Sequence, residues 1–128
     1  MGLGAQQPDS YRRSKADMTL KTQDIGDVVV VAVPGPNLDA SNSDDFKVGM
    51  SAILSSSARI VLDLGELEFV DSSGLGSFLT CLRQLNASGG DLKLCRMRKP
   101  VRTLFELVRM HRVFDIVGTP EEAIAAFK

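Results

Sequence analysis

The sequence has few of the residues on which several functions depend. It contains no tryptophan, one tyrosine (Tyr11), one histidine (His111) and two cysteines, Cys81 and Cys95. One histidine and two cysteines that form no CxxC pair fall short of the four nitrogen or sulfur ligands of a structural zinc site. The scarcity of tryptophan and tyrosine argues against a platform for stacking nucleic-acid bases. Two free thiols are typical of a reducing compartment, so we expect a cytoplasmic protein.

Charge of one sign and long apolar runs are missing as well. The 15 lysines and arginines nearly balance the 16 acidic residues, which gives a formal net charge of −1. A direct nucleic-acid interface would require a basic excess or stripe. No apolar run approaches the roughly 18 residues of a membrane span. We therefore expect no nucleic acid, no membrane, no metal and no other cofactor as a direct partner.

The 128 residues correspond to about one domain. Residues 1–17 are polar, lack periodicity and contain no apolar core of a signal peptide. We predict that residues 1–17 form a flexible extension whose deletion leaves the melting temperature nearly unchanged. The folded domain is then expected over residues 18–128.

Strand patterns alternate with helical patterns along this domain. The β-branched run at residues 28–33 predicts a strand buried on both faces, with residues 19–23 as its hairpin neighbour. Further strands are expected at residues 59–64, 91–96 and 114–117. This alternation predicts an α/β fold, with a mixed sheet of about five strands covered by about four helices.

Four helices are expected from apolar spacing and from end signals. Ser41 is compatible with an N-terminal cap for the first, Pro100 opens the third, and Thr119 with Glu122 forms a capping box for the fourth. The apolar residues expected to face the core are Phe46, Met50, Ile53, Leu54, Leu75, Phe78, Leu79, Leu82, Leu85, Val101, Leu104, Phe105, Val108, Ile124 and Phe127.

The segment Asp71-Ser-Ser-Gly-Leu-Gly76 lies where an extended stretch turns into the second helix. Ser72 is expected at or beside the N-cap, where unsatisfied N–H groups and the helix dipole favour an anion such as phosphate. Gly74 and Gly76 each cost about 1 kcal/mol of helix stability relative to alanine. They either leave the surface beside the hydroxyl uncrowded or permit close backbone packing. The simplest alternative is that Asp71, Ser72 and Ser73 only cap the helix.

The run from Val70 to Gly76 resembles the signature of STAS domains, in particular of bacterial anti-sigma-factor antagonists, and the resemblance extends over roughly residues 19–128. It implies a non-enzymatic protein that binds an anti-sigma factor, itself a serine kinase, and thereby frees a sigma factor. It also implies that phosphorylation of Ser72 by this kinase releases the protein, and that a separate phosphatase removes the phosphate.

The resemblance further implies a partner-binding surface made of two segments. Its residues are Asp39, Ser41, Asn42, Asp71, Ser72, Ser73 and Gly74. The family commonly has Gly-x-Leu-Asp in the first segment, whereas this chain has Gly35-Pro-Asn-Leu-Asp39. Loops at one edge of a layered sheet gather on one face, so we expect Asp39, Ser41, Asn42, Ser72 and Gly74 to form one exposed patch. On this expectation, Gly74→Trp would block binding by bulk without unfolding the helix.

Other functions stay open at this point. A serine hydrolase would require a base near Ser72 or Ser73, and the Gly-x-Ser-x-Gly elbow is not met. A receiver-like phosphoacceptor would use the acidic run from Asp63 through Glu66 and Glu68 to Asp71, although a solvated acidic loop is the simpler interpretation. Some STAS domains are instead unphosphorylated scaffolds of signalling complexes or subunits of transporters.

The C-terminal half also carries a run of basic residues. A solvated helix face is its simplest interpretation, and a contact with an acidic partner is the alternative. The run consists of Lys93, Arg96, Arg98, Lys99, Arg102, Arg109 and Arg112.

Overall fold

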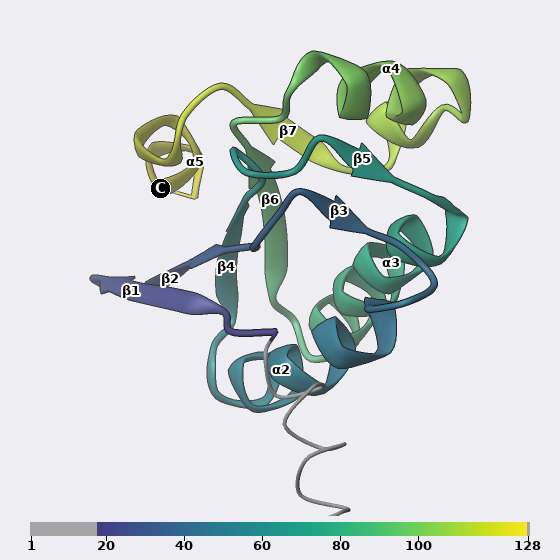
Figure 1. Cartoon of the computed structure of the whole chain (residues 1–128). Helices are drawn as coiled ribbons and strands as arrows, with labels where there is room; N and C mark the ends of the chain where they lie inside the picture. The colour runs from purple at the N-terminus through teal and green to yellow at the C-terminus, as the bar shows by residue number, and fades with distance from the viewer. Residues whose placement is uncertain (1–17, 128) are drawn as a thin grey trace, which may run out of the picture.

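A five-stranded mixed sheet forms the centre of the computed structural model, which describes residues 18–127 (Figure 1). Strand β1 (Lys21–Ile25) is antiparallel to β2 (Val28–Ala32), as the predicted hairpin requires. Strands β4 (Arg59–Asp63), β6 (Asp91–Cys95) and β7 (Asp115–Val117) run parallel to β2. The order β1-β2-β4-β6-β7 confirms the predicted mixed sheet. The extension predicted for residues 1–17 lies outside the described residues.

The four α-helices within residues 18–127 divide unequally between the two faces of this sheet. Helices α2 (Ser43–Ser56), α3 (Ser72–Ala87) and α4 (Lys99–Leu107) cover one face, and α5 (Pro120–Ala126) covers the other (Figure 1). The larger core lies under α2, α3 and α4, where four phenylalanine rings pack in sequence: Phe46, Phe78, Phe105 and Phe114. A smaller apolar cluster lies under α5. Within residues 18–127, no helix combines the length and apolar character that crossing a membrane requires.

The helix ends follow the sequence signals with one exception, and one residue expected in the core is exposed. The capping box at α5 is present, because Glu122 N–H donates to Thr119 Oγ1 and the Glu122 carboxylate accepts from Thr119 N–H. Ser41 does not cap α2, since that helix begins at Ser43 and Asn42 occupies the N-cap position. Val108 was expected in the core, but it lies at the C-cap of α4 and is 42% exposed.

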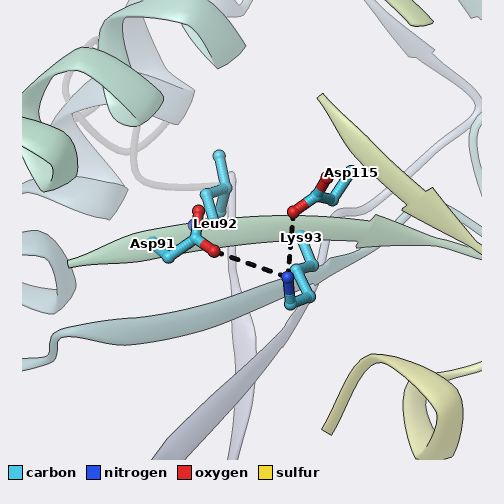
Figure 2. Close-up of polar contacts among 4 residues, drawn as sticks. All are labelled: Asp91, Leu92, Lys93 and Asp115. Carbon is cyan, nitrogen blue, oxygen red and sulfur yellow. Dashed lines mark hydrogen bonds and ion pairs between the residues drawn. The ribbon is translucent and has the colours of Figure 1, made fainter. Parts of the chain in front are cut away.

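Lys93 contradicts the interpretation of the basic run as a solvated helix face. It lies on β6, where its side chain is only 8% exposed. Its Nζ is 2.9 Å from Asp115 Oδ2 and 3.4 Å from Asp91 Oδ2 (Figure 2), and it lies 4.8 Å from the centroid of the Phe127 ring. Three other members of the run form ion pairs: Arg96 with Asp63, Arg98 with Glu68 and Arg102 with Glu106.

A second, two-stranded sheet is the part of the fold that the sequence patterns did not predict. Strands β3 (Asn37–Leu38) and β5 (Phe69–Val70) pair in parallel, with Asn37 opposite Phe69 and Leu38 opposite Val70. Figure 1 shows this pair beyond β2 and β4, beside the start of α3. It positions the candidate site.

Candidate functional site

Pairing of β3 with β5 brings the two predicted binding segments together. Strands β2 and β4 are parallel neighbours, so the chain leaves both at the same edge of the main sheet. The Pro36 carbonyl then accepts from Glu68 N–H at 2.7 Å and from Phe69 N–H at 3.2 Å. Asp71 N–H donates to the Leu38 carbonyl at 3.3 Å. The loop that follows β3 therefore lies against the start of α3.

The two-stranded sheet has an apolar inner face and an outer face that carries the candidate residues. Leu38 and Val70 point into the core and are fully or almost fully buried. Side chains alternate along a strand, so Asn37 and Phe69 lie on the opposite, outer face. Neither outer residue was among the predicted site residues. Each of these strands contains only two residues, too few for the sequence to show an alternation that would have identified them.

Asp39 is the centre of a compact hydrogen-bonded loop. Its carboxylate accepts from Asn37 Nδ2 at 2.6 Å, from Ser41 N–H at 2.9 Å and from Ser41 Oγ at 2.6 Å. The hydroxyl and N–H of Ser41 hold the pKa of the Asp39 carboxyl below its usual value, because they stabilise the ionised form. Asn42 closes the loop, since its Oδ1 accepts from Asp39 N–H and its Nδ2 donates to the Asn37 carbonyl. The loop presents an ordered negative charge.

Asp71, rather than Ser72, caps helix α3 and also joins the two segments. Its Oδ1 accepts from Gly74 N–H at 3.0 Å, and its Oδ2 accepts from Ala40 N–H at 3.1 Å. Ser72 is the first residue of the helix and is exposed, whereas Ser73 is partly buried. The expected position of Ser72 beside the cap is confirmed. Its hydroxyl is not needed for capping.

The prediction of one exposed patch is wrong for one of its five residues, Gly74. Gly74 is buried, and a Cβ there would collide with the Leu38 carbonyl oxygen and lie 2.9 Å from Val70 Cγ1. Gly74 is thus the point at which the backbone of α3 approaches β3. The prediction that Gly74→Trp blocks binding without unfolding is wrong, because its side chain would enter the core side of the site. Asp39 and Asn42 are partly buried, while Ser41 and Ser72 are exposed.

The acidic run considered as a magnesium site is distributed among separate interactions. Asp63 accepts from Gly65 N–H and pairs with Arg96, Glu68 lies 3.9 Å from Arg98, and Asp71 is the helix cap. In the part of the chain that the structure describes, no three histidine, cysteine or acidic side chains form a group able to hold a metal ion.

The cysteines and the histidine are outside the two segments of the candidate site. Cys81 and Cys95 are buried, and burial raises the pKa of each thiol to about 12. His111 is exposed in the short 3₁₀ helix η1 (Met110–Arg112).

The fold and the exposed serine at the start of α3 define a class of small α/β domains with a two-segment surface at one sheet edge. The family model of the STAS domain matches residues 19–123. This chain belongs to the STAS domain family.

Curated relatives carry names from one functional class. The chain is 32% identical over 108 residues to BtrV of Bordetella bronchiseptica, whose name assigns it as an anti-sigma factor antagonist; the match covers 84% of this chain and 93% of BtrV. It is 30% identical over 99 residues to the anti-sigma F factor antagonist of Paenibacillus polymyxa, with 76% of this chain and 84% of that protein covered.

Solved structures share the fold. A Thermotoga maritima protein assigned as an anti-sigma factor antagonist has a TM-score of 0.77 at 26% identity, with 84% of this chain and 92% of that chain covered. Bacillus SpoIIAA in its unphosphorylated form has a TM-score of 0.65 at 23% identity, over 85% of this chain and 97% of SpoIIAA. Its phosphorylated form has a TM-score of 0.64 at 24% identity, over 86% of this chain and all of SpoIIAA.

Proposed function

We propose that this protein is an anti-sigma factor antagonist whose two-segment surface binds an anti-sigma factor that is also a serine kinase. Phosphorylation of Ser72 by that kinase releases the protein, and a phosphatase restores the binding form. The observation that carries this proposal is the exposed Ser72 at the first position of α3, with the cap supplied by Asp71. The names of the curated relatives support the same class of function.

The first turn of α3 can accept a phosphate without rearrangement of the domain. A helix leaves its first four N–H groups without intrahelical partners and carries partial positive charge at that end. Asp71 satisfies only Gly74 N–H in that turn through its side chain. Ser72 is exposed, so a phosphate on its Oγ stays in solvent when the protein is free. SpoIIAA, which has this fold, has been solved in both forms.

Release follows from the charge of the phosphate. A phosphoserine adds about −1.5 to −2 charges at neutral pH. That charge is added beside Asp71, and Ala40 N–H links Asp71 to the Asp39 loop. In a complex that encloses the unmodified hydroxyl, the phosphate is desolvated and repelled by these carboxylates. A loss of about 1.4 kcal/mol in binding free energy lowers the affinity tenfold.

The test of the acceptor site combines a kinase assay with mass spectrometry. The protein is incubated with kinase-type anti-sigma factors and ATP, and the phosphorylated residue is mapped. We expect phosphate on Ser72 in the wild type and in Ser73→Ala, and none in Ser72→Ala, which still binds. Phosphate on Ser73 with Ser72 unmodified contradicts the assignment. Binding with no phosphate on either serine favours the scaffold alternative.

The charge switch is tested separately with Ser72→Asp. The kinase is loaded with ADP, so that no phosphate is transferred. This variant should bind it at least about tenfold more weakly than the wild type does. Its fold should survive, because a carboxylate is favourable in the first turn of a helix. Ser51→Asp is the matched control, since it adds the same charge at an exposed position of α2. Equal affinities of wild type and Ser72→Asp in titration calorimetry would reject the switch.

A further inference from the structure

Phe69 is an aromatic side chain exposed at the candidate site. It is 54% exposed, and within residues 18–127 it is the one aromatic residue among the large exposed apolar side chains. Single exposed apolar residues are common on protein surfaces, so exposure alone has no functional meaning. The position of Phe69 and its hydrogen-bonded backbone distinguish it.

The backbone on both sides of Phe69 is fixed. Its N–H donates to the Pro36 carbonyl at 3.2 Å, and it lies opposite Asn37 in the β3–β5 pair. Two residues later the chain reaches Asp71, which caps α3, and Ser72 follows. The Phe69 side chain therefore extends from the outer face of the strand pair, next to both binding segments. An aromatic side chain has only two rotatable bonds and so loses little conformational entropy on binding, and aromatic residues are enriched in the cores of protein interfaces.

Polar and acidic residues are the neighbours of Phe69 on the two segments. Asn37 lies opposite it, and its amide holds the Asp39 carboxylate. Glu68 precedes it with a side chain that is 62% exposed, and the Asp71 carboxylate follows it on the same face. An apolar centre within a polar rim is the usual anatomy of a protein interface.

We infer that Phe69 is the apolar anchor by which this protein binds its anti-sigma factor, inserted in an apolar pocket of that partner. This inference rests on the proposed function and names a contact residue for that same surface. Two other apolar side chains are more exposed than Phe69, Val48 on α2 at 75% and Leu107 at the end of α4 at 78%, but neither belongs to the β3–β5 pair that positions the candidate site.

The test measures affinity for the kinase-type anti-sigma factor that phosphorylates the wild type, with ADP present so that no phosphate forms. Phe69→Ala should lower the affinity at least about tenfold, and Phe69→Tyr, which keeps the ring, should restore most of it. Ile25→Ala is the matched control, because Ile25 is an exposed apolar residue next to the β1–β2 turn, at the opposite edge of the sheet. Unchanged affinity of a folded Phe69→Ala overturns the inference. The inference is also overturned if Leu107→Ala lowers the affinity and Phe69→Ala does not.

A second measurement covers the case in which Phe69→Ala folds poorly. The six phenylalanines allow selective ¹⁵N labelling of the wild type with few signals. Addition of the partner should shift or broaden the Phe69 signal and leave that of the buried Phe105 unchanged. An unaffected Phe69 signal in a formed complex overturns the inference alone. A wild type that binds no kinase-type anti-sigma factor overturns the proposed function together with it.

Discussion

The hydrogen bonds around Asp39 and Asp71 show which side chains of the candidate site stabilise its structure. The Asp71 carboxylate accepts hydrogen bonds from Gly74 N–H in the helix and from Ala40 N–H in the neighbouring loop. The Ser72 hydroxyl is not part of this link. Asp39 is held by Asn37 and Ser41. A substitution of Ser72 therefore tests function, whereas a substitution of Asp71 would also disturb the fold.

The Ser41 hydroxyl should control the ionisation of Asp39. Ser41→Ala removes the 2.6 Å hydrogen bond that most strongly lowers the pKa of this carboxyl, so the pKa should rise toward its ordinary value of 3.8. Because the folded pKa is lowered, the ionised form stabilises the folded loop above that value, and this contribution is lost as the pH falls. Carboxyl-carbon NMR titration measures the change. Ser51→Ala should leave the Asp39 titration unchanged, and an equal pKa in Ser41→Ala would contradict the prediction.

The two glycines of α3 have opposite structural roles. The sequence left open whether they clear the surface or permit close packing. A Cβ on Gly74 would collide with the backbone of β3, whereas a Cβ on Gly76 would meet nothing within 4 Å. Close packing is therefore the explanation at Gly74, and open space surrounds Gly76.

This contrast gives a matched pair of variants. Gly74→Ala should destabilise the domain by about 1–3 kcal/mol, because the Leu38 carbonyl is backbone and has to move. Gly76→Ala should stabilise it by about 0.5–1 kcal/mol, since alanine favours a helix interior over glycine. Urea unfolding measures both. A Gly74→Ala protein as stable as the wild type would show that α3 does not require this close approach.

The main strands and helices could be predicted because each carries a long periodic pattern. The β-branched run of β2 and the apolar spacing of α3 are of this kind. Strands β3 and β5 contain two residues each, too few for a period, and they form only because β2 and β4 end side by side. The sequence thus indicated Asp39 and Ser72 but did not predict Phe69 as their neighbour. The burial of Gly74 likewise depends on β3, which lies 36 residues earlier at Leu38 (74 − 38 = 36).

The exposed candidate site and the buried ionisable side chains belong to different parts of the structure. The candidate site lies beyond the ends of β2 and β4 (Figure 1), while Lys93, Cys81 and Cys95 are buried within the domain. Lys93 is placed under α5 by Asp115 and Asp91, which remain 62% and 46% exposed. Burial lowers the pKa of Lys93, but the hydrogen bond and charge of Asp115, together with Asp91, outweigh burial and raise it above its ordinary value.

Global stability should fall at alkaline pH. The thiols of Cys81 and Cys95 have pKa values raised from 9.0 to about 12, so above pH 9 they ionise in the unfolded chain before they do so in the folded one. The folded state then binds more protons, and stability falls by up to about 1.4 kcal/mol per thiol for each pH unit in that range. The raised pKa of Lys93 acts in the same direction at still higher pH, above its ordinary value of 10.5. Urea unfolding between pH 7 and pH 10, with reductant present, should show this slope. The decrease of the unfolding free energy with pH should be smaller in Cys81→Ala. An equal decrease in this variant and in the wild type would mean that ionisation of the Cys81 thiol does not destabilise the folded state.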